Sequence, residues 1–89
     1  MIDIQNIRQI RWGCRRGMLE LDQVLLNFFT NYYASLSNIM QQQFKQLLQE
    51  SDADLFDWLF NQKLPVDPDM CNLILCIIES IGGKDGLKP

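Results

Sequence analysis

The stretch MLELDQVLLNFFTNYY, residues 18–33, decides the fold class of this 89-residue chain. Its apolar residues recur at spacings of three and four, the pattern of a helix that turns one side toward a core. That stripe consists of Leu21, Val24, Leu25, Phe28 and Tyr32. Leu19, Leu26 and Tyr33 lie off the stripe, so we expect contacts on two sides of the helix. The stretch is therefore predicted to form the central helix of an all-α domain.

One helix is predicted before this stretch and one directly after it. Gly17 offers a natural stop or kink between the first helix and the central one. Ser37 is a predicted N-cap for the helix that follows, which would run to about Gln49. The inward residues would be Ile7, Ile10 and Cys14 in the first helix, and Met40, Phe44, Leu47 and Leu48 in the helix after Ser37.

Two further helices are predicted in the last third of the chain. Ser51 or Asp52 can cap the first of them. Asp67 and Pro68 are a predicted N-cap and first helical residue for the second, which Gly82-Gly83 would end. The inward residues would be Leu55, Phe56, Trp58 and Leu59 in one helix, and Met70, Leu73, Ile74, Ile77, Ile78 and Ile81 in the other.

Length and composition predict a single small domain. Hydrophobic residues make up 47% of the chain, which is too high for a disordered protein. With only 5 glycines and 3 prolines, few breaks are expected within the helices. We predict a compact bundle of five short helices over residues 1–83, followed by a flexible tail over residues 84–89.

Cysteine usage and the absence of histidine limit the chemistry. The three cysteines, Cys14, Cys71 and Cys76, are predicted to be buried free thiols in a reducing compartment. No histidine is present, which removes the commonest general base and the commonest metal ligand. We therefore expect no metal site, no catalytic residue and no stably bound cofactor. A binding module is favoured over an enzyme.

Neither secretion nor membrane insertion is expected. Residues 1–16 lack the long apolar core of a signal peptide. The apolar run from Leu73 to Ile81 is shorter than the roughly 20 residues that span a bilayer. We expect a soluble monomer in the bacterial cytoplasm, or in the mitochondrial matrix if the source is eukaryotic. Exposure of Leu19 or Phe29 could support a dimer, although simple packing is the commoner role of such residues.

Positive charge is concentrated near the start of the chain. The formal net charge is −3, yet all the arginines lie within residues 8–16: Arg8, Arg11, Arg15 and Arg16. Such a patch on an acidic body suits a partner with exposed carboxylates or a negative groove. Non-specific nucleic-acid binding needs a basic surface. A DNA-binding helical domain, suggested only by the arginine-rich first helix, therefore ranks last.

The stretch RRGMLELD, residues 15–22, has two interpretations. In the first, Gly17 ends the first helix or permits a tight turn. If the helix instead runs through, Arg16 can pair with Glu20, for about 0.3–0.5 kcal/mol. In the second, the stretch contacts a partner, because a glycine lets another backbone approach closely. Arginines would supply planar donors to that partner, and Trp12 would be a flat anchor unless it packs inward. An ion pair this weak does not by itself explain why Arg16 and Glu20 occupy these positions.

Two sequence blocks carry a family resemblance. IRWGCRRGMLELD, residues 10–22, resembles the N-terminal block of the succinate dehydrogenase flavinylation factors, whose Arg-Gly-x-x-Glu hallmark is matched by Arg16, Gly17 and Glu20. DLFDWL, residues 54–59, is similar to a second block of that family, the SdhE family of FAD assembly factors. The resemblance covers roughly residues 4–65. It departs at Gly13 and Met40, which affects the expected helix boundaries more than the hallmark.

The resemblance implies a specific function. It points to an assembly factor that binds the flavoprotein subunit of succinate dehydrogenase, or of fumarate reductase, and promotes covalent attachment of FAD to a histidine of that subunit. FAD would then be the partner's cofactor. If the family's hallmark residues have the same role in this chain, Arg16, Gly17 and Glu20 would contact the partner. A wider contact surface would also include Arg15, Arg11, Arg8 and Trp12. We expect Asp54 and Trp58 to be mainly structural, with Trp58 packed in the core, because large aromatic residues dominate small cores.

An alternative remains within the same resemblance. Bacterial members of this family are also described as CptB-type antitoxins, which implies an antitoxin-like or cytoskeleton-regulating binding module. Recovery of a small toxin or a filament protein from a lysate, without the flavoprotein, would favour this alternative.

Overall fold

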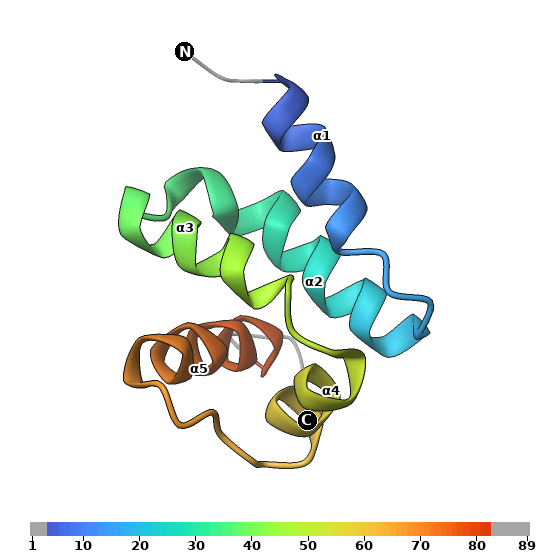
Figure 1. Cartoon of the computed structure of the whole chain (residues 1–89), viewed down its shortest axis with the longest axis vertical. Coiled ribbons are helices and arrows are strands. Elements are labelled where there is room, and N and C mark those ends of the chain that lie inside the picture. Colours follow the sequence, from blue (N-terminus) through green and yellow to red (C-terminus); the bar gives the residue numbers. More distant parts are fainter. Residues whose placement is uncertain (1–3, 83–89) are drawn as a thin grey trace.

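Five α-helices and one turn of 3-10 helix make up residues 4–82, the part of the chain that the computed structural model describes (Figure 1). Their bounds are α1 Ile4–Gly13, α2 Leu19–Tyr32, η1 Tyr33–Ser35, α3 Asn38–Leu47, α4 Asp52–Phe60 and α5 Pro68–Gly82. No strand occurs within this range. The all-α class and the five short helices predicted from the sequence are confirmed. The tail predicted for residues 84–89 lies outside the described residues.

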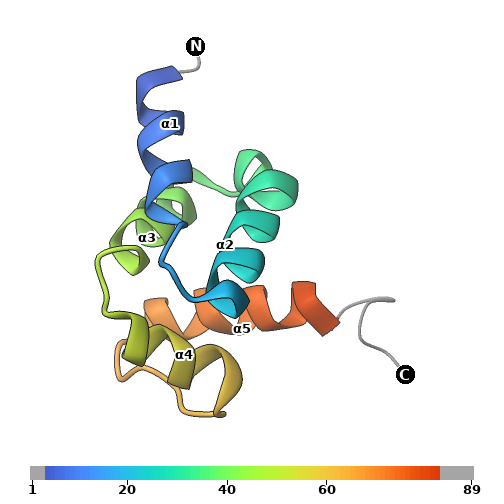
Figure 2. The same ribbon diagram turned by 90° about the vertical axis from the view of Figure 1, so that its right-hand side faces the viewer.

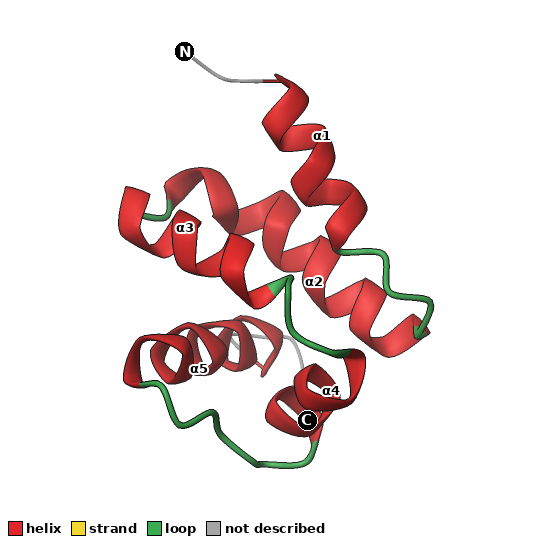
Figure 3. Cartoon of the chain, viewed as in Figure 1, coloured by secondary structure: helices red, strands yellow, loops and turns green. Residues whose placement is uncertain are grey.

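The helices form a layered bundle in which α2 is central. α2 and α3 lie side by side, α5 lies against both of them, and α4 contacts α5 and α2 (Figures 1 and 2). α1 extends from the opposite side of the α2–α3 pair, away from α4 and α5. Loops are confined to the connections, chiefly residues 14–18, 48–51 and 61–67 (Figure 3).

Helix starts follow the capping residues that the sequence predicts. The Ser37 hydroxyl accepts a hydrogen bond from the amide of Met40 at 3.2 Å, which caps α3. The Ser51 hydroxyl accepts from the amide of Asp54 at 3.1 Å, so Ser51 is the cap of α4 and Asp52 is its first residue. These hydroxyls satisfy amides that have no partner inside the helix. α5 begins at Pro68, as expected.

α3 ends earlier than the sequence predicts. The amides of Gln49 and Glu50 bond to carbonyls three residues back, at 2.9 and 3.0 Å, instead of continuing the α-helical pattern. The last turn therefore tightens, and the α3–α4 connection begins at Leu48. Carbonyl groups at such a helix end need partners from elsewhere in the molecule.

The core is built around the Phe44 ring. Its centroid lies 5.7 Å from those of Phe28 and Tyr33 and 6.4 Å from that of Phe29. Such spacings are typical of packed aromatic rings. The buried core consists of Ile10, Cys14, Leu21, Leu25, Phe28, Phe29, Tyr33, Phe44, Leu47, Leu55, Leu59, Met70, Leu73, Ile74 and Ile77. Trp58 is partly buried against this core, in line with the structural role predicted for it.

Three residues predicted to lie in the core are more exposed than expected: Tyr32, Cys71 and Cys76. Tyr32, assigned to the central stripe, is 39% exposed because α2 ends there and Tyr33 turns inward beside Phe44. Cys76 is exposed and Cys71 only half-buried, so the prediction of buried thiols is wrong for these two and confirmed for Cys14. Both lie at the edges of the α5 face that packs on the core. Phe29, considered as an exposed dimer contact, is buried.

No helix within residues 4–82 combines the length and apolarity that crossing a bilayer requires.

Candidate functional site

The predicted contact residues lie on the second half of α1 and on the connection to α2. α1 stops at Gly13 because the chain then tightens: the amide of Arg15 bonds to the Trp12 carbonyl at 3.0 Å, a three-residue spacing. α2 does not begin until Leu19. The two helices are therefore separate, and the continuous helix that an Arg16–Glu20 pair would require does not form.

Gly17 forms the bend in this connection. Its φ of +89° lies in the region that residues with a side chain rarely adopt, which confirms the turn predicted there. A Cβ atom added at this position would meet no atom within 4 Å. The backbone conformation therefore favours glycine, while the space beside it is open to solvent.

Asp22 holds the backbone of the same turn. Its carboxylate accepts hydrogen bonds from the amide of Arg16 and, at 3.3 Å, from the amide of Gly17. It also lies 3.9 Å from Nε of Arg15, at the limit of an ion pair. Asp22 is not among the contact residues predicted from the sequence. An acid in the first turn of α2, just after a glycine turn, was the available signal.

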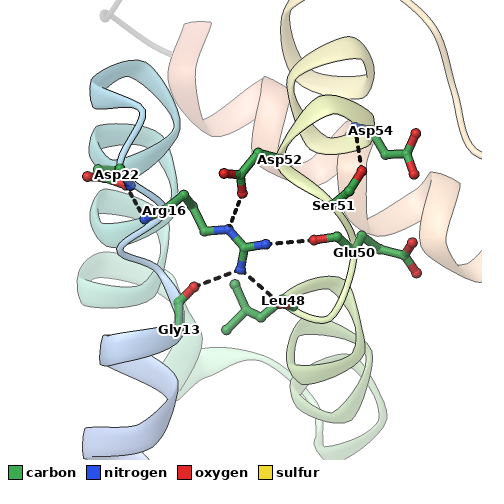
Figure 4. A network of polar contacts seen from close by, with 9 residues as sticks. Gly13, Arg16, Asp22, Leu48, Glu50, Ser51, Asp52 and Asp54 are labelled. Carbon is green, nitrogen blue, oxygen red and sulfur yellow. Dashed lines mark hydrogen bonds and ion pairs between the residues drawn. The ribbon is translucent and has the colours of Figure 1, made fainter.

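Arg16 points into the molecule and joins two connections (Figure 4). Its Nη1 donates to the carbonyls of Gly13 at 3.0 Å and Leu48 at 2.8 Å, and its Nη2 donates to the carbonyl of Glu50 at 2.6 Å. Its Nε donates to Oδ1 of Asp52 at 2.8 Å. We call these contacts the Arg16 network. The Leu48 and Glu50 carbonyls lie just beyond the end of α3, and the Gly13 carbonyl lies at the end of α1.

The inward position changes the interpretation of Arg16. Its side chain is only 14% exposed, and it pairs with Asp52, 36 positions later in the chain, instead of Glu20. The guanidinium group uses four of its five N–H donors within the fold. A direct contact between Arg16 and a partner stays a prediction. The observed role of its side chain is to fix the α1–α2 connection against the α3–α4 connection.

Four of the other predicted residues gather on one surface, which we call the arginine face: Arg8, Arg11, Trp12 and Arg15. Together with Leu26 of α2 they line a depression of about 290 Å³. Trp12 is 74% exposed, so it does not pack inward and its indole is available to a partner. Arg11 stacks on the buried Phe29 ring, with Cζ 5.4 Å from the ring centroid. That contact orients one of the guanidinium groups.

Gly17 and Glu20 form a second exposed element, the contact turn, defined here as residues 17–20. Both are exposed, and within the part of the chain that the structure describes the Glu20 carboxylate makes no hydrogen bond or ion pair. Arg15 of the arginine face lies beside Asp22, which holds the contact turn. The two elements are therefore neighbours. Of the seven predicted contact residues, six have exposed positions and Arg16 does not.

The arginine face and the contact turn present guanidinium, indole and carboxylate groups, which are suited to binding a partner. Among residues 4–82, no group of three or more cysteine or acidic side chains could hold a metal ion. Cys14, the thiol nearest the site in sequence, is fully buried. Burial raises its pKa from 9.0 to about 12, although Arg11 and Arg16 lower it slightly and Asp22 raises it. The thiol therefore stays protonated at neutral pH and is a poor nucleophile.

The raised pKa of Cys14 predicts an alkaline loss of stability. The unfolded chain releases the thiol proton near its ordinary pKa of 9.0, whereas the folded chain holds it until about 12. The contribution is therefore fully present below pH 9 and is lost as the pH rises toward 12. Urea denaturation between pH 8 and pH 11 measures this loss. Cys14→Ala should show a shallower decline, and an identical decline in both proteins would contradict the assignment.

Comparison with known proteins identifies the family of this chain. Residues 8–80 match the family described as "Flavinator of succinate dehydrogenase". The chain is 41% identical over 69 residues to the FAD assembly factor SdhE of Pasteurella multocida, covering 78% of this chain and 82% of that protein. It is 41% identical over 76 residues to the SdhE protein of Pectobacterium atrosepticum and 42% identical over 76 residues to that of Yersinia pestis, covering 85% of this chain and 86% of each relative. The chain belongs to the succinate dehydrogenase flavinator family.

Proposed function

We propose that this protein binds the flavoprotein subunit of succinate dehydrogenase and promotes covalent attachment of FAD to a histidine of that subunit. Membership of the flavinator family and the names of its relatives support an FAD assembly factor. The chain has no histidine of its own, so the acceptor belongs to the partner. We further propose that it is a monomeric, cytoplasmic protein that is not itself an enzyme, and that fumarate reductase is a second partner.

The observation that carries this proposal is the exposed contact turn beside the arginine face. At Gly17 a partner's backbone can approach without meeting a side chain. The exposed Glu20 carboxylate has no bonding partner among residues 4–82, so it can accept donors from another protein. Trp12 supplies a large exposed anchor of the kind that dominates binding energy at interfaces. Arg8, Arg11 and Arg15 supply planar donors for carboxylates. We assign all six residues to the partner interface.

Assistance of this kind needs no reactive group in the factor. Covalent attachment requires the acceptor histidine and the flavin to be held in a reactive geometry. A bound protein can supply that geometry by orienting the partner's domains. This chain contributes surface and rigidity, while FAD and the acceptor remain with the partner. We therefore expect no stable FAD complex with the isolated protein.

The direct test is a flavinylation assay. The purified protein, the flavoprotein subunit lacking FAD, and free FAD are mixed, and covalent flavin fluorescence is read on a denaturing gel. The protein should raise the rate of attachment by at least about tenfold, a modest part of what orientation can supply. Fluorescence equal to that of a mixture without this protein would overturn the proposal. Capture of a toxin or filament protein in its place would favour the antitoxin-like alternative.

A further inference from the structure

The α3–α4 connection reaches the contact turn through one side chain. The Arg16 guanidinium donates to the carbonyls of Leu48 and Glu50 and to the carboxylate of Asp52 (Figure 4). The backbone amide of Arg16 donates to Asp22. The contact turn begins at the next residue. The contacts of the Arg16 side chain and the Asp22 contact of its backbone amide therefore fix the residue that immediately precedes Gly17.

α4 holds the Asp52 carboxylate in a fixed position beside Arg16. Leu55 and Leu59 are buried in the core, and Trp58 packs against it, so the helix is fixed from its inner face. Ser51 caps its first turn. Asp52, the first residue of α4, thus presents its carboxylate from a well-anchored position. The second sequence block of the family, residues 54–59, is the segment that anchors it.

The contact turn needs such a support. A glycine with positive φ has more freedom than any other residue, so the turn would sample several conformations if left to itself. Asp22 restrains the turn from the α2 side. The Arg16 network restrains it from the α4 side. A turn held from both sides loses less conformational entropy when a partner binds.

We propose that Asp52 is a positioning residue for partner binding, acting through Arg16 to hold Gly17 and Glu20 in the conformation that the partner recognises. This role rests on the proposed function, because the partner is the flavoprotein subunit. It also gives residues 54–59 a role beyond packing. They anchor α4, and α4 presents the Asp52 carboxylate that orients Arg16 in the block of residues 10–22. Asp52 itself need not touch the partner.

The test compares Asp52→Ala with Asp54→Ala. Both remove one carboxylate from the first turn of α4, but the Asp54 side chain points away from Arg16 in Figure 4. Asp52→Ala should weaken binding to the flavoprotein subunit by about tenfold, the cost of ordering a turn that is no longer held. Asp54→Ala should bind like the original protein. Binding is measured by titration well below the unfolding temperature, with circular dichroism as a check on folding.

A second readout separates positioning from loss of stability. At saturating concentration of the factor, the Asp52→Ala protein should still reach the original rate of flavin attachment, because the bound turn is the same. Its amide NMR signals at residues 17–20 should shift or broaden, whereas those of Asp54→Ala should not. Unchanged affinity and unchanged signals in Asp52→Ala would overturn the proposal, and so would equal losses of affinity in the two variants.

Failure of the proposed function would look different. In that case the original protein itself would not bind the flavoprotein subunit. The NMR comparison needs no partner, so it would still decide whether Asp52 sets the conformation of the contact turn. Undisturbed signals in Asp52→Ala would then reject the positioning role as well.

Discussion

Arg16→Ala is expected to lower the free energy of unfolding by about 2–4 kcal/mol, a large part of the 5–15 kcal/mol typical of a small domain. The loss comes mainly from the three carbonyl acceptors of Gly13, Leu48 and Glu50, which are left without their charged donor. The pair with Asp52 adds less, because that carboxylate is 41% exposed and water screens it. Urea denaturation followed by circular dichroism measures the change.

Two further variants sharpen this prediction. Arg16→Lys keeps the positive charge but cannot reach several acceptors at once, so it should lie between the original protein and the alanine variant. Arg8→Ala removes an exposed arginine from the arginine face and should change stability by less than about 0.5 kcal/mol. If Arg16→Ala were as stable as Arg8→Ala, the Arg16 network would not exist in solution.

The fold was largely predictable because its determinants are local. Ser37 and Ser51 each sit directly before an amphipathic segment and cap the helix that follows. Proline at position 68 starts α5 because its fixed φ suits a first helical turn. The stripe of residues 21–28 identifies the inner side of α2 by spacing alone. Each of these signals needs only residues within about two helical turns of each other.

The predictions fail where a residue depends on distant partners. Arg16 looked like a surface residue because a sequence cannot show that the α3–α4 connection, more than 30 positions later, passes beside it. The early end of α3 creates the acceptors for Arg16, and that end is a feature of the tight turn at residues 48–50. Cys76 was assigned to the core because it lies in an apolar run, although its helix face is only partly covered.

The sequence predicted which residues gather at the candidate site, but not the directions in which their side chains point. The clustering of arginines and the glycine turn were visible in the sequence, and the structure gathers Arg8, Arg11, Trp12 and Arg15 around one depression. The opposite orientations of the neighbouring residues Arg15 and Arg16 could not be read from the sequence. Arg15 faces outward and Arg16 inward because the chain leaves the helix after Gly13, and residues beyond a helix end no longer follow its periodicity.

Gly17→Arg is expected to reduce binding to the flavoprotein subunit, and with it FAD attachment, by at least about a hundredfold, a loss of roughly 3 kcal/mol. The substituted side chain would project into space that is empty in this molecule, so nothing in the fold itself is displaced. The same space is where a partner's backbone would approach. Binding is measured by titration, and covalent flavin fluorescence reports the consequence for attachment.

Gly17→Ala and Val66→Arg isolate the cause of this loss. Gly17→Ala imposes a comparable backbone strain at φ +89°, about 1 kcal/mol, with a much smaller side chain, so it should lose similar stability but far less binding. Val66→Arg adds the same charge at a 98% exposed position in the α4–α5 connection and should bind normally. Equal binding losses in Gly17→Ala and Gly17→Arg would place the effect in the conformation of the turn. Normal binding by Gly17→Arg would remove the contact turn from the interface, because an arginine cannot occupy a surface that a partner covers closely without disturbing it.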